Sequence, residues 1–135
     1  MTPENAQKLY DAFPLLYRRR CHSSPDLAMA INLDCGDGWF DLIWTLSQSI
    51  NHCAEQEGRT HSDGTWPVAT QVKEKCGSLR VYLKNSSAEM ATLTGEARTN
   101  SEKICEFCGM PGARVAISGI KTLCAAHAQI PQHKY

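Results

Sequence analysis

The longest regular pattern of apolar residues in the chain begins at Trp39 and predicts an amphipathic helix. Its apolar side chains recur every three or four positions, which places them on one helix face: Trp39, Leu42, Ile43, Leu46, Ile50 and Cys53. The pattern ends near Glu57-Gly58, where a stretch rich in loop-forming residues begins. Before it, Asp37 lies in a turn and can accept hydrogen bonds from the first free amides of the helix. We expect this helix to organise the core.

Two shorter segments alternate apolar with other side chains, which is typical of β-strands with one buried face. Their alternating positions are Val68, Thr70 and Val72 in the first segment and Leu79, Val81 and Leu83 in the second. A two-residue turn at Cys76-Gly77 places Lys73 opposite Arg80 and Val72 opposite Val81. The sequence therefore predicts a β-hairpin with one apolar and one basic face.

Capping signals predict two further helices. Near the start, Thr2-Pro3-Glu4 combines an N-cap, a first-turn proline and an acid, and Pro14 should end or redirect the helix. Later, Ser86-x-x-Glu89 matches a capping box and opens a helix that leads to Cys105. The segment from Cys21 to Cys35 is too short and irregular for a strand or a helix to be assigned.

The length of 135 residues and the 42% of hydrophobic residues suit one compact domain with its own core. We predict an α+β fold in which helices pack on a β-hairpin or small antiparallel sheet, followed by a zinc-ribbon-like module. Residues 1–104 form the expected α+β core, and residues 105–135 form the expected zinc-binding module packed on it. The chain has neither a signal-peptide pattern nor an apolar run of about 18 residues, so we expect a soluble, cytoplasmic protein without a membrane partner.

The C-terminal part contains two pairs of metal-ligand residues at short spacing. They form the pattern Cys105-x2-Cys108-x15-Cys124-x2-His127. Two residues between ligands let a tight turn aim both side chains at one ion, and thiolate and imidazole are the ligands that Zn²⁺ prefers. The fifteen residues between the pairs are enough for a short hairpin. We predict a structural zinc site with four protein ligands, which leaves no open position for activating water.

The other cysteines and acids suggest weaker alternatives. An odd total of seven cysteines argues against a secreted disulfide framework. Cys21-His22 and His52-Cys53 invite a second metal or a Cys–His nucleophile, but Cys53 lies on the apolar stripe and favours core packing. Asp34, Asp37 and Asp41 lack the full ligand series of a calcium loop, so capping and turn formation explain them better.

Charge adds one candidate surface to a chain whose 14 basic and 14 acidic residues cancel. The basic side of the predicted hairpin, here called the basic face, consists of Lys73, Lys75, Arg80, Tyr82 and Lys84. It can bind phosphate or carboxylate groups, or it can be a solvated face whose charges are relieved by Glu74 or other acids. Arg18-Arg19-Arg20 forms a second basic cluster, whose distance from the hairpin the sequence does not give.

Three stretches occur together between about Asp34 and His127, CGDGWFDLI, VATQVKEKCGSLRVYL and CEFCG…TLCAAHA. In this combination the chain resembles a family of small proteins encoded by tailed phages and prophages. Family members pair a DGW-type helix start and a KEK-x-GGLR-type hairpin with a terminal zinc motif, whereas this chain has Cys76 and Ser78 in the turn.

The resemblance implies a phage origin and, by analogy with other small phage proteins, a role in binding a host target. We therefore expect a non-enzymatic protein that binds and inhibits or redirects a host protein or nucleoprotein complex, with an anti-defence role such as inhibition of a CRISPR nuclease. The alternative is a nucleic-acid-binding accessory or regulatory protein that uses the basic face. An enzyme ranks third, because the sequence has no catalytic constellation that can be assigned residue by residue.

Overall fold

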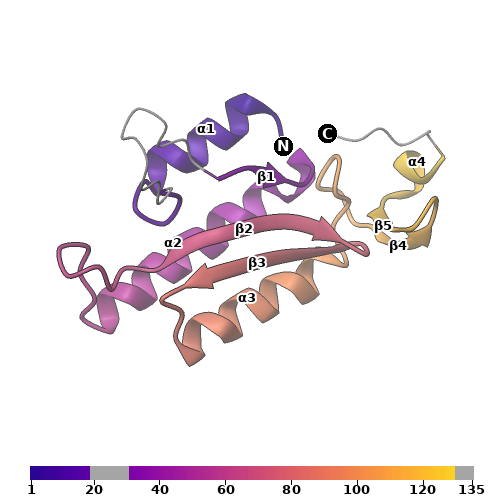
Figure 1. The fold of residues 1–135 in the computed structure, drawn as a ribbon. Helices are drawn as coiled ribbons and strands as arrows, with labels where there is room; N and C mark the ends of the chain where they lie inside the picture. The colour runs from indigo at the N-terminus through magenta and orange to yellow at the C-terminus, as the bar shows by residue number, and fades with distance from the viewer. Residues whose placement is uncertain (19–30, 130–135) are drawn as a thin grey trace.

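The chain folds into a helix-covered sheet followed by a small hairpin module, as a computed structural model that describes residues 1–18 and 31–129 shows (Figure 1). The elements are α1 (Pro3–Ala12), β1 (Leu33–Asp34), the 3-10 helix η2 (Asp37–Trp39), α2 (Phe40–Gln56), β2 (Val68–Lys75), β3 (Ser78–Lys84), α3 (Ala88–Ser101), β4 (Ala113–Ala116), β5 (Ile120–Leu123) and α4 (Ala125–Ala128). The predicted α+β class is confirmed. Among the described residues, no helix is long and apolar enough to cross a lipid bilayer.

The larger sheet has three strands in the order β1-β2-β3. Strands β2 and β3 are antiparallel, and the predicted pairs Lys73–Arg80 and Val72–Val81 are confirmed. Strand β1 runs parallel to β2 and pairs Asp34 with Lys73, so the sheet is mixed rather than purely antiparallel. The sequence did not predict β1, because a strand of two residues is too short to show alternation.

The turn between β2 and β3 consists of two residues with left-handed backbone angles. Cys76 has φ 53° and Gly77 has φ 79°. Positive φ at both central residues is the signature of a type I′ turn, whose twist matches that of the strands on either side. The predicted two-residue turn at Cys76-Gly77 is therefore of type I′.

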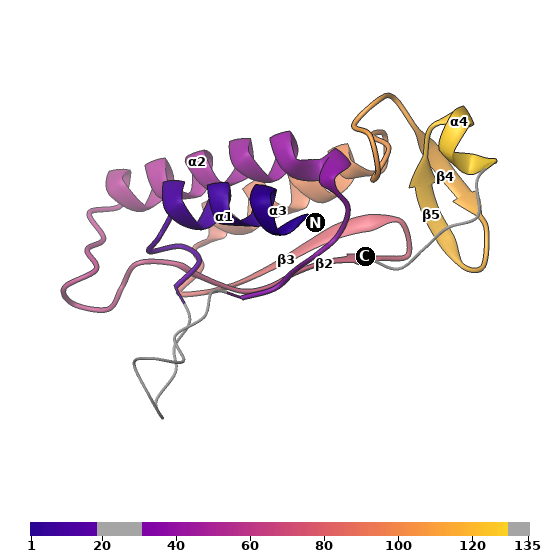
Figure 2. The same cartoon turned by 90° about the horizontal axis from the view of Figure 1, so that it is seen from above.

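The helices α1, α2 and α3 all lie on one side of the larger sheet (Figures 1 and 2). Their apolar faces meet the apolar face of the hairpin in one core cluster, in which Trp39, Ile43 and Ile50 join Val72 and Leu79. The packing predicted for the helix that begins at Trp39 is confirmed. On the other side of the sheet no described helix lies against the strands (Figure 2), and Lys75, Tyr82 and Lys84 of the basic face are exposed there.

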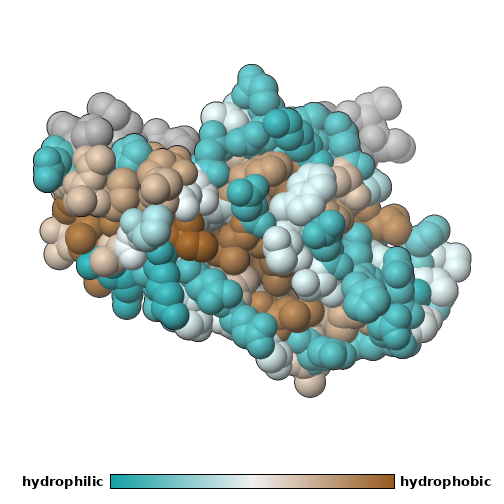
Figure 3. Space-filling view, turned by 180° about the vertical axis from the view of Figure 1, so that it is seen from behind, coloured by the Kyte–Doolittle hydropathy of each residue, from teal (hydrophilic) through white to brown (hydrophobic). Residues whose placement is uncertain are grey.

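On the helix side of the molecule, patches of apolar surface are visible between polar side chains (Figure 3). Several side chains of α2 and α3 are only partly buried while they pack against the core, including Phe40, Leu42, Trp44 and Leu93. The helices therefore bury one stripe each and leave its margins in contact with solvent.

The helix caps agree with the sequence at α1 and differ at α2 and α3. Thr2 caps α1, as predicted. At α3 the N-cap is Ser87, one residue later than predicted, and its Oγ accepts from the Met90 amide at 3.2 Å. The predicted capping box is wrong, because Met90 and not Glu89 stands three residues after the cap. Asp37 does not cap α2, because its Oδ1 accepts from the Thr2 amide at 2.8 Å and thereby ties α2 to the start of α1.

Replacing Leu46 with alanine should destabilise the protein by about 2–5 kcal/mol, because the side chain leaves a cavity in the core. Leu46 is only 6% exposed and belongs to the core cluster. Urea unfolding followed by circular dichroism measures the loss. Thr45→Ala, an exposed change one position away, is the control and should alter stability by about 0.5 kcal/mol or less. A loss below about 1 kcal/mol for Leu46→Ala would contradict the assigned packing.

Candidate metal centre

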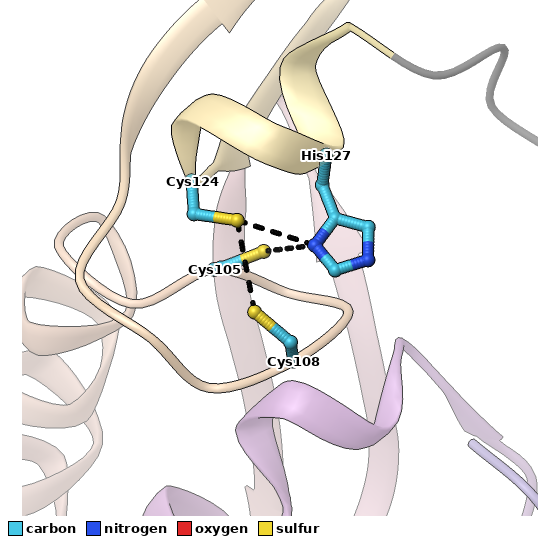
Figure 4. A group of neighbouring side chains, drawn as sticks. All are labelled: Cys105, Cys108, Cys124 and His127. Carbon is cyan, nitrogen blue, oxygen red and sulfur yellow. Dashed lines mark hydrogen bonds between the residues drawn. The ribbon is translucent and has the colours of Figure 1, made fainter.

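The four predicted zinc ligands converge on one point in the C-terminal module (Figure 4). The ligand atoms of Cys105, Cys108, Cys124 and His127 all lie within 4.8 Å of one another. Nδ1 of His127 is 3.2 Å from Sγ of Cys124 and 3.6 Å from Sγ of Cys105. Sγ of Cys108 is 3.7 Å from Sγ of Cys124, which is far outside bonding distance for a disulfide.

These separations are those of ligands around a single tetrahedral ion. Metal–sulfur bonds of about 2.3 Å and a metal–nitrogen bond of about 2.0 Å give tetrahedron edges of about 3.8 Å between sulfurs and about 3.5 Å between sulfur and nitrogen. The observed sulfur–sulfur distance of 3.7 Å and sulfur–nitrogen distances of 3.2 and 3.6 Å match both values closely. The Cys3His cluster can therefore bind one metal ion, with His127 contributing Nδ1.

Local backbone structure places the two halves of the cluster. The first pair lies in a tight loop in which the Cys105 amide donates to Met110 O at 2.7 Å and the Gly109 amide donates to Cys105 O at 2.9 Å. The second pair lies at the short helix α4, with Cys124 at the N-cap. Between the pairs, β4 and β5 form the short antiparallel hairpin that the spacing predicted. The ring of Phe107 stacks on that of His127, with the centroids 5.7 Å apart, and orients the imidazole.

One of the thiols is already acidic before any metal binds. Hydrogen bonds from the backbone and ring of His127 lower the pKa of Cys124 to about 6. A thiolate is the form that binds metal, so this ligand is ready at neutral pH. Cys105 is fully buried at the base of the cluster, whereas Cys108 lies at its exposed rim.

The metal loop packs against the turn that precedes α2, a contact that the sequence did not predict. The Gly38 amide donates to Glu106 O at 2.7 Å, and the Trp39 indole donates to Ile104 O at 2.9 Å. A Cβ atom added at Gly38 would lie 2.1 Å from Cys105 O, so only glycine fits there. The only sequence signal for this contact was the pair of glycines in the CGDGW stretch.

A buried carboxylate extends this contact to the hairpin. Glu106 is fully buried; its Oε2 accepts from the Gly36 amide at 3.3 Å and its Oε1 lies 3.6 Å from the Lys121 ammonium. Burial raises the pKa of Glu106 to about 7, although Lys121 acts to lower it. Lys121 also pairs with Glu74 of β2 at 2.6 Å, and Glu74 accepts from the Gly77 amide at 2.9 Å.

The tip of the β2–β3 hairpin is thus held against the metal module, and Thr122 completes the contact by donating to Gly77 O at 2.6 Å. These bonds join residues on both sides of the predicted division into residues 1–104 and 105–135. The division itself stays a prediction, but the module is attached to the core through Glu106, Lys121 and Thr122.

The residues of the basic face lie together on the helix-free side of β2 and β3, as their alternation requires. The Lys73 ammonium is 5.8 Å from the centroid of the Tyr82 ring. Nε of Arg80 is buried and has no hydrogen-bond partner. The exposed carboxylate of Asp34 belongs to the same face, because it pairs with Lys73 across β1 and β2. Glu74, which was considered as a counter-charge, instead binds Lys121 on the other side of β2.

The second basic cluster is described only at Arg18, whose guanidinium donates to Trp66 O at 3.0 Å and Leu15 O at 2.5 Å. Arg19 and Arg20 lie outside the described residues, as do Cys21 and His22. The Arg18 side chain is thus bound by backbone carbonyls rather than directed toward the basic face.

Cys53 packs in the core, as its position on the apolar stripe predicted. Cys53 is 6% exposed, and burial followed by a hydrogen bond to Glu57 raises its pKa to about 11, so it is not an activated nucleophile. Cys53, Glu57 and Glu89 do approach within 4.8 Å of one another, but the two carboxylates lie at the surface and the thiol stays protonated. Within residues 1–18 and 31–129, Asp34, Asp37 and Asp41 form no metal-ligand group.

No protein-family model, curated protein or solved structure matches this chain. The chemistry of the site is therefore argued from its own residues. A tetrahedral shell filled by four protein ligands has no position for water or substrate, which is the arrangement found in structural metal sites.

Proposed function

We propose that the chain is a zinc-stabilised binding protein that acts through its basic face. Tetrahedral sites built from thiolates and an imidazole favour zinc, which tolerates that geometry without redox chemistry. The edge lengths around Cys105, Cys108, Cys124 and His127 suit one ion rather than a multi-iron cluster, which would hold the thiolates farther apart. The zinc has a structural role in this proposal, and the protein is not an enzyme.

The observation that carries the binding role is the pair of like charges at the centre of the basic face. Lys73 and Arg80 are direct cross-strand partners, an arrangement that destabilises an isolated sheet. Within the described residues neither cation forms an ion pair. Asp34 is a carboxylate beside Lys73 on this face. An anionic partner would supply the missing counter-charges. The like charges therefore favour binding of an anion, although they destabilise the sheet of the free protein.

The partner that we propose is a host protein or nucleoprotein complex, which the chain inhibits or redirects. The phage-type resemblance motivates the more specific proposal of an anti-defence role, such as inhibition of a CRISPR nuclease. Direct binding of nucleic acid is the second candidate, and the exposed Tyr82 among the cations of the basic face is the observation that favours it.

Reversing the central charges should abolish binding without unfolding the protein. Lys73→Glu combined with Arg80→Glu replaces two unpaired cations by anions, and we expect capture of the host complex to fall at least about 10-fold, the equivalent of about 1.4 kcal/mol. Quantitative affinity purification from host cells measures the capture, and circular dichroism checks folding.

The matched control reverses two exposed cations on the helices instead, Lys8 of α1 and Arg98 of α3. The double variant Lys8→Glu with Arg98→Glu has the same net charge and should capture the complex normally. Equal loss in both variants would mean that net charge alone matters, and normal capture by the basic-face variant would refute the proposed surface.

A further inference from the structure

We infer that the ligand of the basic face is a single strand of nucleic acid, held by base stacking on Tyr82 and by phosphate contacts to the surrounding cations. The inference rests on the proposed function, because it names the chemical class of the ligand that the same face binds. It goes beyond that function by assigning separate roles to the aromatic ring and to the charges.

Tyr82 is placed to stack on a base. It is 45% exposed, and Met110 and Ile120, the other large apolar residues described as exposed, lie in the metal module rather than on the larger sheet. A tyrosine on an open sheet face offers a flat ring to any base, and such stacking tolerates different sequences. The Lys73 ammonium now lies 5.8 Å from the ring centroid and can turn toward a phosphate when a base takes that place.

The cations around Tyr82 follow the direction of the hairpin. Residues on one face of a strand recur about every 7 Å, so Lys73 and Lys75 on β2 and Arg80 and Lys84 on β3 form two adjacent rows. Tyr82 lies between Arg80 and Lys84 in its row. An extended strand of nucleic acid that runs along the hairpin therefore meets cations before and after the base that stacks on the ring.

A single strand fits these features better than a duplex or an acidic protein does. The bases of a duplex are paired and stacked internally, so a flat sheet face would reach only its phosphates and Tyr82 would have no base to bind. An acidic protein surface would use the cations but would not need an aromatic ring among them. A single strand, a duplex and an acidic protein would use the ring and the cations differently, so variants of Tyr82 and of the cations can tell these three ligands apart.

The test is fluorescence anisotropy with labelled oligo(dT) and oligo(U) of about 12 nucleotides and the full-length, metal-loaded protein. Replacing a stacking aromatic by alanine weakens single-strand binding by about 5- to 150-fold, which is the loss we expect for Tyr82→Ala. Tyr82→Phe keeps the ring and should bind like the wild type. Arg80→Glu should weaken binding and make it less dependent on salt, whereas Arg98→Glu on α3 should change neither.

Equal binding by Tyr82→Ala and the wild type would overturn the inference, and so would equal binding of single strands and of the matching duplex. Two results separate this inference from the proposed function. If no oligonucleotide binds, yet Lys73→Glu with Arg80→Glu still loses the host complex, the ligand is a protein and only the inference fails. If that double variant captures the complex normally and no oligonucleotide binds, the basic face has no binding role and both fail.

Discussion

Chelating the metal should unfold the C-terminal module and loosen the core to which it is attached. Metal-binding free energy in small zinc modules is on the order of 10 kcal/mol and is coupled to folding. The module has little apolar core of its own. Among its described residues from Cys105 onward, the buried ones include two polar residues, Glu106 and Thr122. We expect about one zinc per chain by elemental analysis, and loss of the module's circular dichroism when a strong chelator is added.

Cys108→Ser should have a similarly large effect, since it removes one of four ligands from the cluster. Cys76→Ser is the matched control, because Cys76 is an exposed cysteine in the β2–β3 turn and belongs to no ligand group among the described residues. It should leave both the zinc content and the thermal unfolding temperature close to those of the wild type. Well under one equivalent of metal in the wild type, or unchanged stability in Cys108→Ser, would refute the structural zinc site.

Gly38→Ala should destabilise the protein by about 3 kcal/mol or more, although it adds a single methyl group. The new Cβ would lie 2.1 Å from Cys105 O and 2.6 Å from Glu106 O. Both are backbone atoms of the metal loop and cannot rotate away, so α2 and the loop must separate. The separation breaks the hydrogen bond from the Gly38 amide to Glu106 O. Denaturant unfolding measures the loss, and a metal-release assay should show weaker zinc retention.

Gly95→Ala is the control for the same chemical change. Gly95 lies within α3, and a Cβ added there meets nothing within 4 Å. Alanine is favoured over glycine inside a helix by about 1 kcal/mol, so this variant should be more stable than the wild type. If Gly38→Ala were as stable as the wild type, the close approach between the α2 turn and the metal loop would be wrong.

The parts of the fold that the sequence predicted depend on local patterns. The apolar stripe from Trp39 defined α2, because helical periodicity persists over enough residues to be read without tertiary information. The pairing of Lys73 with Arg80 followed from assuming a two-residue turn, since turn length fixes the register of a hairpin. The four metal ligands followed from two short spacings and the known chemistry of thiolate and imidazole.

The parts that the sequence missed depend on contacts between distant segments. Strand β1 exists because Leu33 and Asp34 pair with β2, and two residues carry no periodicity of their own. The prediction that Asp37 caps α2 was wrong because its carboxylate accepts a hydrogen bond from the amide of Thr2, at the start of α1. Glu106 and Lys121 lie far apart in the sequence, where each resembles an ordinary solvated charge of the module. Only the fold brings the buried carboxylate of Glu106 close to the Lys121 ammonium.

The contact between the Gly38 turn and the metal loop also has a consequence for how the chain is made. The turn leaves the ribosome well before its partner Glu106 and before the last ligand of the cluster, His127. Non-local contacts of this kind form late, so we expect the start of α2 to stay unfinished during translation. Chains truncated before Cys124 should then be cut by proteases near Gly38, as limited proteolysis can test. Metal binding would therefore mark those chains whose synthesis has passed His127, since the cluster cannot close without that ligand.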